Sequence, residues 1–215
     1  MFTRKVLAVF ITFIFAAGIL AGCGGNTGNT TTGGGSTGGT SGGGTSGGGA
    51  PASGEPIIVG VNFELSGQLA GYGQTKLNGA KIALEEINAA GGALGRPIKL
   101  IEYDNKGDIA EAINISTRLM GEDKVVVMMG PVTSGRVMAS IDVAKQFKIP
   151  MVTGTGTSPG ITVNSDGSIN DFVYRICFID PYQGTLAANY ATETLGLKTA
   201  AMLVNQSDDY SIYMA

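Results

Sequence analysis

Hydroxyl-bearing residues cluster where two apolar runs end, and these side chains are the best suited to hold a ligand. Residues 130–135 read Gly-Pro-Val-Thr-Ser-Gly and lead from one apolar run into a helical pattern that begins at Ser134. Residues 154–159, Gly-Thr-Gly-Thr-Ser-Pro, follow the next apolar run and contain Thr155 and Thr157. Backbone N–H groups at a helix N-terminus carry partial positive charge, so hydroxyls beside them favour a carboxylate or a phosphate. The two segments therefore predict a small anion-binding site.

Plainer interpretations of the same residues stay open. Ser134 has the residue type and the place of an ordinary helix N-cap, and Thr157 has those of a turn residue. The glycines of residues 154–160 also imitate a dinucleotide-binding fingerprint, but their spacing is wrong and Pro159 interrupts the expected helix start.

The composition excludes several kinds of chemistry. The 215-residue chain contains no His, so the usual general base and the commonest metal ligand are missing, and a Ser–His hydrolase is excluded. Two cysteines, Cys23 and Cys177, are too few for a four-Cys zinc site or a disulfide framework. Acidic residues (17) outnumber basic residues (14), which disfavours a phosphate-tracking basic surface. We expect no catalytic centre, no metal, no cofactor and no nucleic-acid partner.

The N-terminus has the pattern of a lipoprotein signal. Two basic residues precede an apolar run over residues 6–17, which is too short for a comfortable membrane span. Residues 20–23, Leu-Ala-Gly-Cys, resemble a bacterial lipobox, in which Cys23 receives a diacylglycerol. We expect a signal peptide over residues 1–22 and an extracytoplasmic protein that Cys23 anchors to the membrane. The alternative is an ordinary signal peptide in which Cys23 is incidental.

Residues 24–54 are predicted to form a disordered tether. They contain 15 Gly among 31 residues, the rest being mostly Thr, Ser and Asn, and they carry no charge. Such a segment cannot bury enough apolar surface to offset its chain entropy. A glycine-rich phosphate loop would need a preceding strand and a following helix, and neither pattern is present. With the lipidated Cys23, the linker spans residues 23–54, and the folded part starts near Glu55.

Strand-like and helix-like patterns alternate from residue 55 onward. The strand-like runs are mostly continuously apolar, as in buried parallel strands, whereas the helical segments repeat apolar residues at intervals of three and four. Asp108 is expected to cap one of the helices. The alternation predicts an α/β fold, a doubly wound parallel sheet with helices on both faces. The expected strands are residues 56–62, 98–103, 125–129, 150–153, 173–176 and 199–204, and the expected helices are about 74–90, 109–119, 134–147 and 181–195.

Ligands of such sheets bind beyond the carboxyl ends of the strands, where the strand order reverses. The loops at residues 63–72, 130–136 and 154–159 lie at such ends. The last two are the hydroxyl-rich segments, so fold and chemistry predict the same site.

Short motifs of this chain, taken in order, resemble the type I periplasmic binding proteins. Leu-Ser-Gly at residues 65–67, Tyr-Gly at 72–73 and the run Ile-Asn-Ala-Ala-Gly-Gly-Ala-Leu-Gly-Arg-Pro-Ile at 87–98 open the match. Gly-Pro-Val-Thr-Ser at 130–134 and Arg175 continue it. The branch that it most resembles is the branched-chain amino-acid-binding family, the solute receptors of ABC importers.

The resemblance covers residues 55 to about 210 and implies a receptor built of two lobes. The first α/β lobe would be nearly continuous over residues 55–178. The second would begin at residues 179–215 and be truncated. The implied partners are a small-molecule ligand, an amino acid or related solute, and the ABC permease subunits.

The resemblance also implies roles for individual residues. Ser134 and Thr157 would hold the α-carboxylate of the ligand, and the carbonyl group of Thr155 would accept from its α-ammonium group. Tyr72 would line the first-lobe side of the cleft, and Tyr210 would close over the ligand from the second lobe. The acid that completes the ammonium site would lie beyond residue 215.

The implied roles of the two tyrosines, and the function itself, have alternatives. Tyr210 is followed by Ser211 where the family has Gly, and Tyr72 could serve surface packing alone. Cys177, without a partner, is expected to be a small buried apolar residue. A sensory or regulatory binding module of the same fold, or an α/β enzyme, are the alternative functions.

Overall fold

A computed structural model of the protein describes residues 52–215. The predicted signal peptide, Cys23 and nearly all of the predicted linker therefore lie outside the described residues. Among residues 52–215, no helix combines the length and the hydrophobicity that are needed to cross a bilayer.

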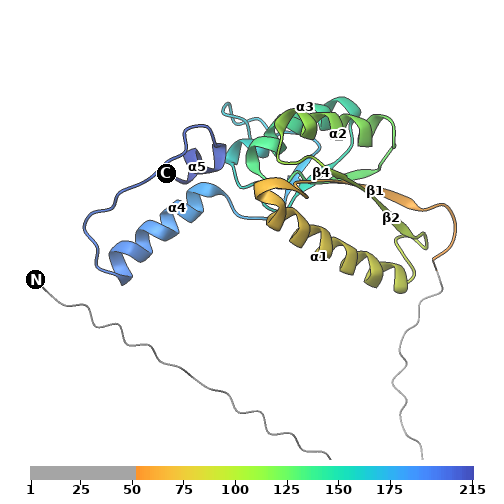
Figure 1. The fold of residues 1–215 in the computed structure, drawn as a ribbon, viewed down its shortest axis with the longest axis horizontal. Helices are drawn as coiled ribbons and strands as arrows, with labels where there is room; N and C mark the ends of the chain where they lie inside the picture. Colours follow the sequence, from red (N-terminus) through yellow and green to blue (C-terminus); the bar gives the residue numbers. More distant parts are fainter. Residues whose placement is uncertain (1–51) are drawn as a thin grey trace, which may run out of the picture. The chain divides into compact units, whose positions relative to one another are not determined.

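Five parallel strands form one sheet in the order β2-β1-β3-β4-β5 (Figure 1). β1 pairs with β2 on one side and with β3 on the other, so the strand order reverses at β1. The prediction of a doubly wound parallel sheet is confirmed, and its topological switch point lies between β1 and β3. The strands are β1 (Ile57–Phe63), β2 (Ile98–Asp104), β3 (Val127–Met129), β4 (Met151–Thr153) and β5 (Val173–Arg175).

Helices cover both faces of this sheet, as predicted. α1 (Ala70–Ala89) lies on one face, and α2 (Ile109–Gly121) and α3 (Ser134–Phe147) lie together on the other (Figure 1). The larger core cluster fills the α2–α3 side and the smaller one the α1 side. The α2–α3 cluster includes Leu119, Met128, Val137 and Met151, and the α1 cluster comprises Val61, Phe63, Leu77 and Val132.

Local signals account for most helix boundaries. α3 begins and ends as predicted, and the Asp108 side chain accepts a hydrogen bond from the N–H of Glu111 at 2.8 Å, as an N-cap does. α1 starts at Ala70, earlier than predicted, because the 3₁₀ turn η1 (Gly67–Leu69) leads directly into it. Gly73 is required in its first turn, since a Cβ there would lie 2.0 Å from the carbonyl oxygen of Glu64.

The C-terminal elements depart from the prediction. The helix expected at residues 181–195 is α4 (Asp180–Asn189) followed by a π-helical turn, η3 (Tyr190–Thr194). The strand expected at residues 199–204 is wrong: these residues form none, because they have no neighbouring strand to pair with. The chain then forms α5 (Asp209–Met214).

The segment between β4 and β5 contains regular structure of its own. It contains the 3₁₀ turn η2 (Pro159–Ile161) and an antiparallel bridge between Val163 and Ile169. η2 buries Ile161 in the core on the α2–α3 side, which fixes the loop over β4 and beside α3.

Candidate functional site

The candidate site lies at the carboxyl ends of β1, β3 and β4. Ser134 opens α3 directly after β3, and Thr155 and Thr157 follow β4. This is the edge of the sheet at which doubly wound folds bind ligands.

Ser134 joins the two hydroxyl-rich loops. It is the first residue of α3 and only 2% exposed, while the N-cap position belongs to Thr133, whose side chain makes no cap bond. Its Oγ accepts hydrogen bonds from the N–H groups of Thr157 and Ser158, both at 3.2 Å. The interpretation of Ser134 as a plain N-cap is therefore wrong. Because its oxygen is used as an acceptor, the hydroxyl proton is free to be donated to a ligand.

Thr157 and Asp180 leave buried polar atoms unpaired beside Ser134. Oγ1 of Thr157 and both carboxylate oxygens of Asp180 have no hydrogen-bond partner among the described residues. The two residues are adjacent, since the N–H of Asp180 donates to the carbonyl oxygen of Thr157 at 3.0 Å. Buried polar groups are normally paired, so this cluster is suited to a polar ligand.

The carboxyl group of Asp180 is buried, and burial disfavours its ionised form. Asp180 is fully buried at the start of α4, and burial raises the pKa of its carboxyl above the ordinary range, although the nearby Thr157 hydroxyl and then the Arg175 guanidinium partly offset this. A cationic group that paired with Asp180 would relieve that cost. Sequence reasoning missed this residue as part of the site, because an Asp ahead of a helical Pro looks like any acidic helix start.

The loop after β3 already contains an anion. Glu64, fully buried at the end of β1, accepts hydrogen bonds from the N–H groups of Val132 (3.0 Å) and Thr133 (3.1 Å) and from the Thr133 hydroxyl (2.8 Å). The expectation that this whole loop faces an incoming anion is therefore wrong for residues 132–133. No local feature of the sequence marks Glu64, because its partners lie 68 and 69 residues away. What remains for a ligand is the first turn of α3, with Ser134.

Thr155 is turned so that its side chain braces the loop. Its Oγ1 donates to the carbonyl oxygen of Val132 at 2.6 Å, and Oγ1 of Thr153 donates to that of Pro131 at 3.0 Å. Thr155 itself is exposed, and its carbonyl oxygen accepts no hydrogen bond from the described residues. That carbonyl is therefore free for a donor, as the resemblance implies.

Arg175 orders the loop after β4 from the other side. Its Nη1 lies 2.8 Å from the carbonyl oxygen of Ser158 and 3.3 Å from that of Thr157, and its Nη2 donates to Oγ1 of Thr162. The carbonyls of Thr157 and Ser158 thus point to Arg175, while the N–H groups of the same two residues point to Ser134. This division keeps the loop in one conformation.

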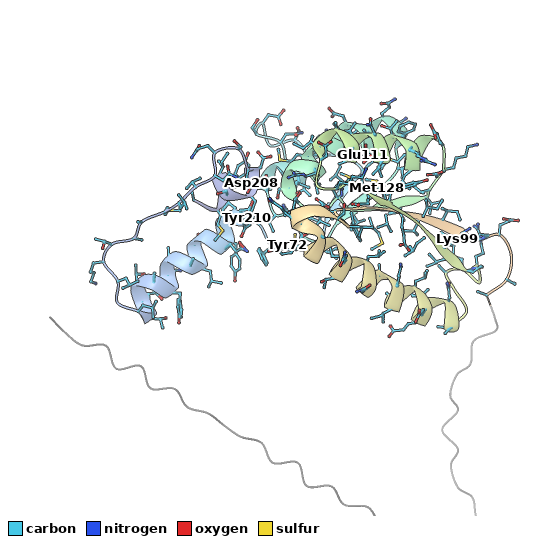
Figure 2. The ribbon with its side chains drawn as sticks, in the orientation of Figure 1. Tyr72, Lys99, Glu111, Met128, Asp208 and Tyr210 are labelled. Atoms are coloured by element: carbon cyan, nitrogen blue, oxygen red, sulfur yellow. The ribbon has the colours of Figure 1, made fainter. Side chains whose placement is uncertain are left out.

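Tyr72 lies on α1 and Tyr210 on α5, two helices that are far apart in the sequence (Figure 2). Tyr72 is 66% exposed, and the Tyr210 hydroxyl donates to Oε1 of Gln183 at 2.9 Å. Burial raises the pKa of the Tyr210 phenol, and the nearby charges of Asp180 and Tyr72 raise it further. The structure therefore places Tyr210 near both Asp180 and Tyr72, with Ser211 following it in the chain.

Other chemical groups nearby give no catalytic or cofactor arrangement. Sγ of Cys177 lies 3.5 Å from the carbonyl oxygen of Gly156, and burial raises the pKa of this partly buried thiol. The loop over residues 154–158 leads into the short turn η2 and not into an α-helix, so it cannot place a pyrophosphate at a helix N-terminus. Among residues 52–215, no group of three His, Cys, Asp or Glu side chains could hold a metal ion.

An open groove lies away from these residues. It has a volume of about 820 Å³ and is lined by α4, residues 200–204 and α5. Tyr210 is the member of the candidate site that it shares. Met202 and Leu203 are exposed beside it, so these apolar side chains are not packed against the described part of the chain.

Comparison with known proteins places the chain in a family. A family model described as "Periplasmic binding protein" matches residues 56–212. The Leu/Ile/Val-binding protein BraC3 of Rhizobium johnstonii is 34% identical over 154 residues, which cover 72% of this chain and 40% of the relative. An amino acid binding protein of Pseudomonas aeruginosa is 29% identical with the same coverage.

Solved structures agree with this result. The branched-chain amino acid transporter substrate binding protein LivJ from Streptococcus pneumoniae, in complex with isoleucine, has 36% identity and a TM-score of 0.70, covering 74% of this chain and 44% of that one. The leucine binding protein LivK from Thermotoga maritima has 31% identity and a TM-score of 0.67, covering 74% and 43%. The chain therefore spans less than half the length of these relatives.

Proposed function

The chain belongs to the periplasmic binding protein family, and from this premise we propose that it is the solute receptor of an ABC importer. In this proposal it binds an amino acid between two lobes outside the cytoplasm and delivers it to permease subunits. Leucine, isoleucine and valine are the first candidate ligands, because relatives are named for them. It is a binding protein and not an enzyme, in keeping with its family.

The observation that carries the proposal is that groups suited to a carboxylate lie next to a group suited to an ammonium ion. The hydroxyls of Ser134 and Thr157 and the first turn of α3 suit a carboxylate. Asp180, buried and unpaired next to Thr157, suits an ammonium group. An amino acid presents both groups a few bonds apart, and both need partners when they are desolvated.

The remaining groups suit the rest of an amino acid. The carbonyl oxygen of Thr155, which accepts no hydrogen bond from the described residues, would accept a second ammonium proton. Tyr72 and Tyr210 offer aromatic surface on the first-lobe and second-lobe sides, respectively, against which an aliphatic side chain would pack. Aromatic walls of this kind support an apolar ligand side chain.

The division into lobes belongs to the same proposal. We assign residues 55–178 to the first lobe and residues 179–215 to the start of the second. The open groove between α4 and α5 supports this, because its apolar lining is a surface that a complete second lobe would cover. Closure of the two lobes would then bury the ligand on both sides.

The attachment to the membrane is proposed from the sequence alone. Residues 1–22 would be a signal peptide, and Cys23 would carry the lipid at the end of a linker over residues 23–54. The folded receptor would then stay close to its permease while it searches for solute.

Calorimetric titration of the two-lobed receptor tests the proposed function. Leucine, isoleucine and valine should bind with one site per molecule, and at least one of them should bind in the micromolar range or tighter. A panel of acidic, amide and aromatic amino acids defines the selectivity. If no amino acid of the panel binds, the proposed ligand class is wrong.

A further inference from the structure

Ser134 follows a loop that is held both by packing and by hydrogen bonds: Val132 is 2% exposed and belongs to the core cluster on the α1 side. Residues 130–133 connect β3 to α3, and the backbone enters the helix in an extended conformation at Thr133. The contacts that hold residues 131–133 therefore determine the direction of the Ser134 hydroxyl.

Hydrogen bonds hold this loop from two opposite sides. From the β4 side, Thr153 and Thr155 donate to the carbonyl oxygens of Pro131 and Val132. From the β1 side, the carboxylate of Glu64 accepts from two consecutive N–H groups and one hydroxyl of the loop. The loop is thus a bridge between two strands, and Glu64 supplies every bond on one side of it.

Glu64 cannot be replaced by a neighbouring group of the described chain. It is fully buried, forms no salt bridge within the described residues, and its other contact is a long one, 3.5 Å, from Nδ2 of Asn105. A carboxylate can accept about four hydrogen bonds, and here three come from residues 132–133. Removing it would leave one buried N–H group, one partly buried N–H group and one partly buried hydroxyl without an acceptor.

We propose that Glu64 is the positioning residue of the carboxylate subsite, an internal anion that occupies the switch point and thereby aims Ser134 at the ligand. The proposal rests on the proposed function, because it assumes that Ser134 holds a ligand carboxylate. Glu64 does not touch the ligand; it acts through residues 132–133 and the start of α3.

The proposal predicts that an external anion can replace Glu64. Glu64→Ala removes the carboxylate and leaves a space of about the size of acetate, lined by the three freed donors. Acetate that enters this space would accept the same hydrogen bonds and return the loop to its conformation. A role in packing alone would not be restored by a soluble carboxylate.

Binding of leucine to the two-lobed receptor is the first readout. Glu64→Ala should weaken binding by about 10-fold or more, as expected for disturbing a hydrogen bond to a charged ligand group. Sodium acetate should recover most of that loss, whereas sodium chloride at equal ionic strength should not. Unchanged affinity in a folded Glu64→Ala protein, or equal effects of the two salts, overturns the proposal.

Asp104 provides a matched control. Its carboxylate also accepts three backbone hydrogen bonds, from Leu65, Ser66 and Lys106, but none from the loop before α3. Asp104→Ala should lower the melting temperature while leaving leucine affinity unchanged, with no acetate-specific recovery. An affinity loss equal to that of Glu64→Ala would show that any destabilisation of this region weakens binding, which also overturns the proposal.

A ligand-free readout separates this proposal from the proposed function. The N–H groups of Thr157 and Ser158 are bonded to Oγ of Ser134, so their hydrogen exchange reports where that oxygen lies. Exchange at both positions should accelerate in Glu64→Ala and slow again with acetate. If wild-type protein binds no amino acid but these exchange changes occur, the ligand class fails and the positioning role stands.

Glu64→Gln covers the case in which the alanine variant does not fold. The amide keeps the shape but offers only one oxygen, so its NH₂ group must face a donor of the loop. We expect the same changes in affinity and exchange, in smaller measure. A Glu64→Gln protein with wild-type affinity and wild-type exchange would show that the carboxylate is not what positions Ser134.

Discussion

The side-chain oxygen of Ser134 lies 3.2 Å from the backbone nitrogen of Thr157 and accepts its hydrogen bond, which joins the helix after β3 to the loop after β4. Oγ1 of Thr157 lies in the same buried region without a partner of its own within the described chain. The Ser134 hydroxyl therefore helps to hold the helix and the loop together, whereas the Thr157 hydroxyl does not. The two residues should respond differently to substitution.

Ser134→Ala should weaken both binding and stability. The affinity for an amino acid should fall roughly 10- to 150-fold, from the loss of about 1.5–3 kcal/mol in a hydrogen bond to a charged group. The free energy of unfolding should fall by about 1–3 kcal/mol, because two buried N–H groups lose their acceptor. Calorimetry and urea unfolding measure the two effects. Wild-type affinity would mean that the ligand carboxylate lies elsewhere.

Thr157→Val should separate the two effects. Valine retains the shape but lacks the hydroxyl, which lies near the Asp180 carboxyl without a hydrogen bond of good geometry to any of the described residues. We expect stability equal to or above that of wild type, with an affinity loss of roughly 10- to 150-fold. A clear loss of stability with unchanged affinity would contradict the assignment of this hydroxyl to the ligand.

Asp180→Asn should change how stability depends on pH. Burial raises the pKa of Asp180, so the folded protein binds this proton more tightly than the unfolded chain does. The stabilising contribution is full below the unfolded-state pKa, about 3.9, and is lost as pH rises through the folded-state pKa. The variant should therefore be more stable than wild type at neutral pH, with a difference that shrinks towards acid pH, while its amino-acid affinity falls.

Urea unfolding over a series of pH values measures this difference. Asp166→Asn is the control: hydrogen bonds from Ser168 lower the pKa of Asp166, so its loss should act in the opposite direction. If the free energy of unfolding of Asp180→Asn differs from that of wild type by the same amount at every pH, ionisation of Asp180 is not the cause.

Cys23 should carry lipid. Metabolic labelling with a radioactive fatty acid should mark the mature protein, and the label should partition with membranes. Label that persists in Cys23→Ala would reject this residue as the attachment point.

Residues 1–215 by themselves should bind amino acids weakly. In the proposed division into lobes, α4, η3 and α5 are the helical elements of the second-lobe side within residues 52–215, and Met202 and Leu203 are exposed there. We expect millimolar affinity at best, about −4 kcal/mol, for leucine, isoleucine, valine and polar amino acids. Micromolar binding of any of them to this chain would show that one lobe suffices.

The sequence by itself determined the class of fold and pointed to the candidate site. The helix at 134–147, the Asp108 cap and the alternation of strands and helices along the chain follow from patterns within a few residues, and such patterns act locally. The order of the short motifs over residues 65–175 is enough to indicate the family. Ser134, Thr155 and Thr157 could be named because they follow strands whose ends meet in such a sheet.

Only the tertiary structure decided how the charges and hydroxyls are used. Glu64 and Asp180 are two among 17 acidic residues, and nothing beside them in the chain shows that they are buried. Glu64 finds its donors 68 and 69 residues away, and Ser134 finds its own 23 and 24 residues away. The strand expected at residues 199–204 failed for a related reason, because an apolar run becomes a strand only beside a partner. Burial and pairing depend on contacts distant in sequence, and such contacts exist only once the chain has folded.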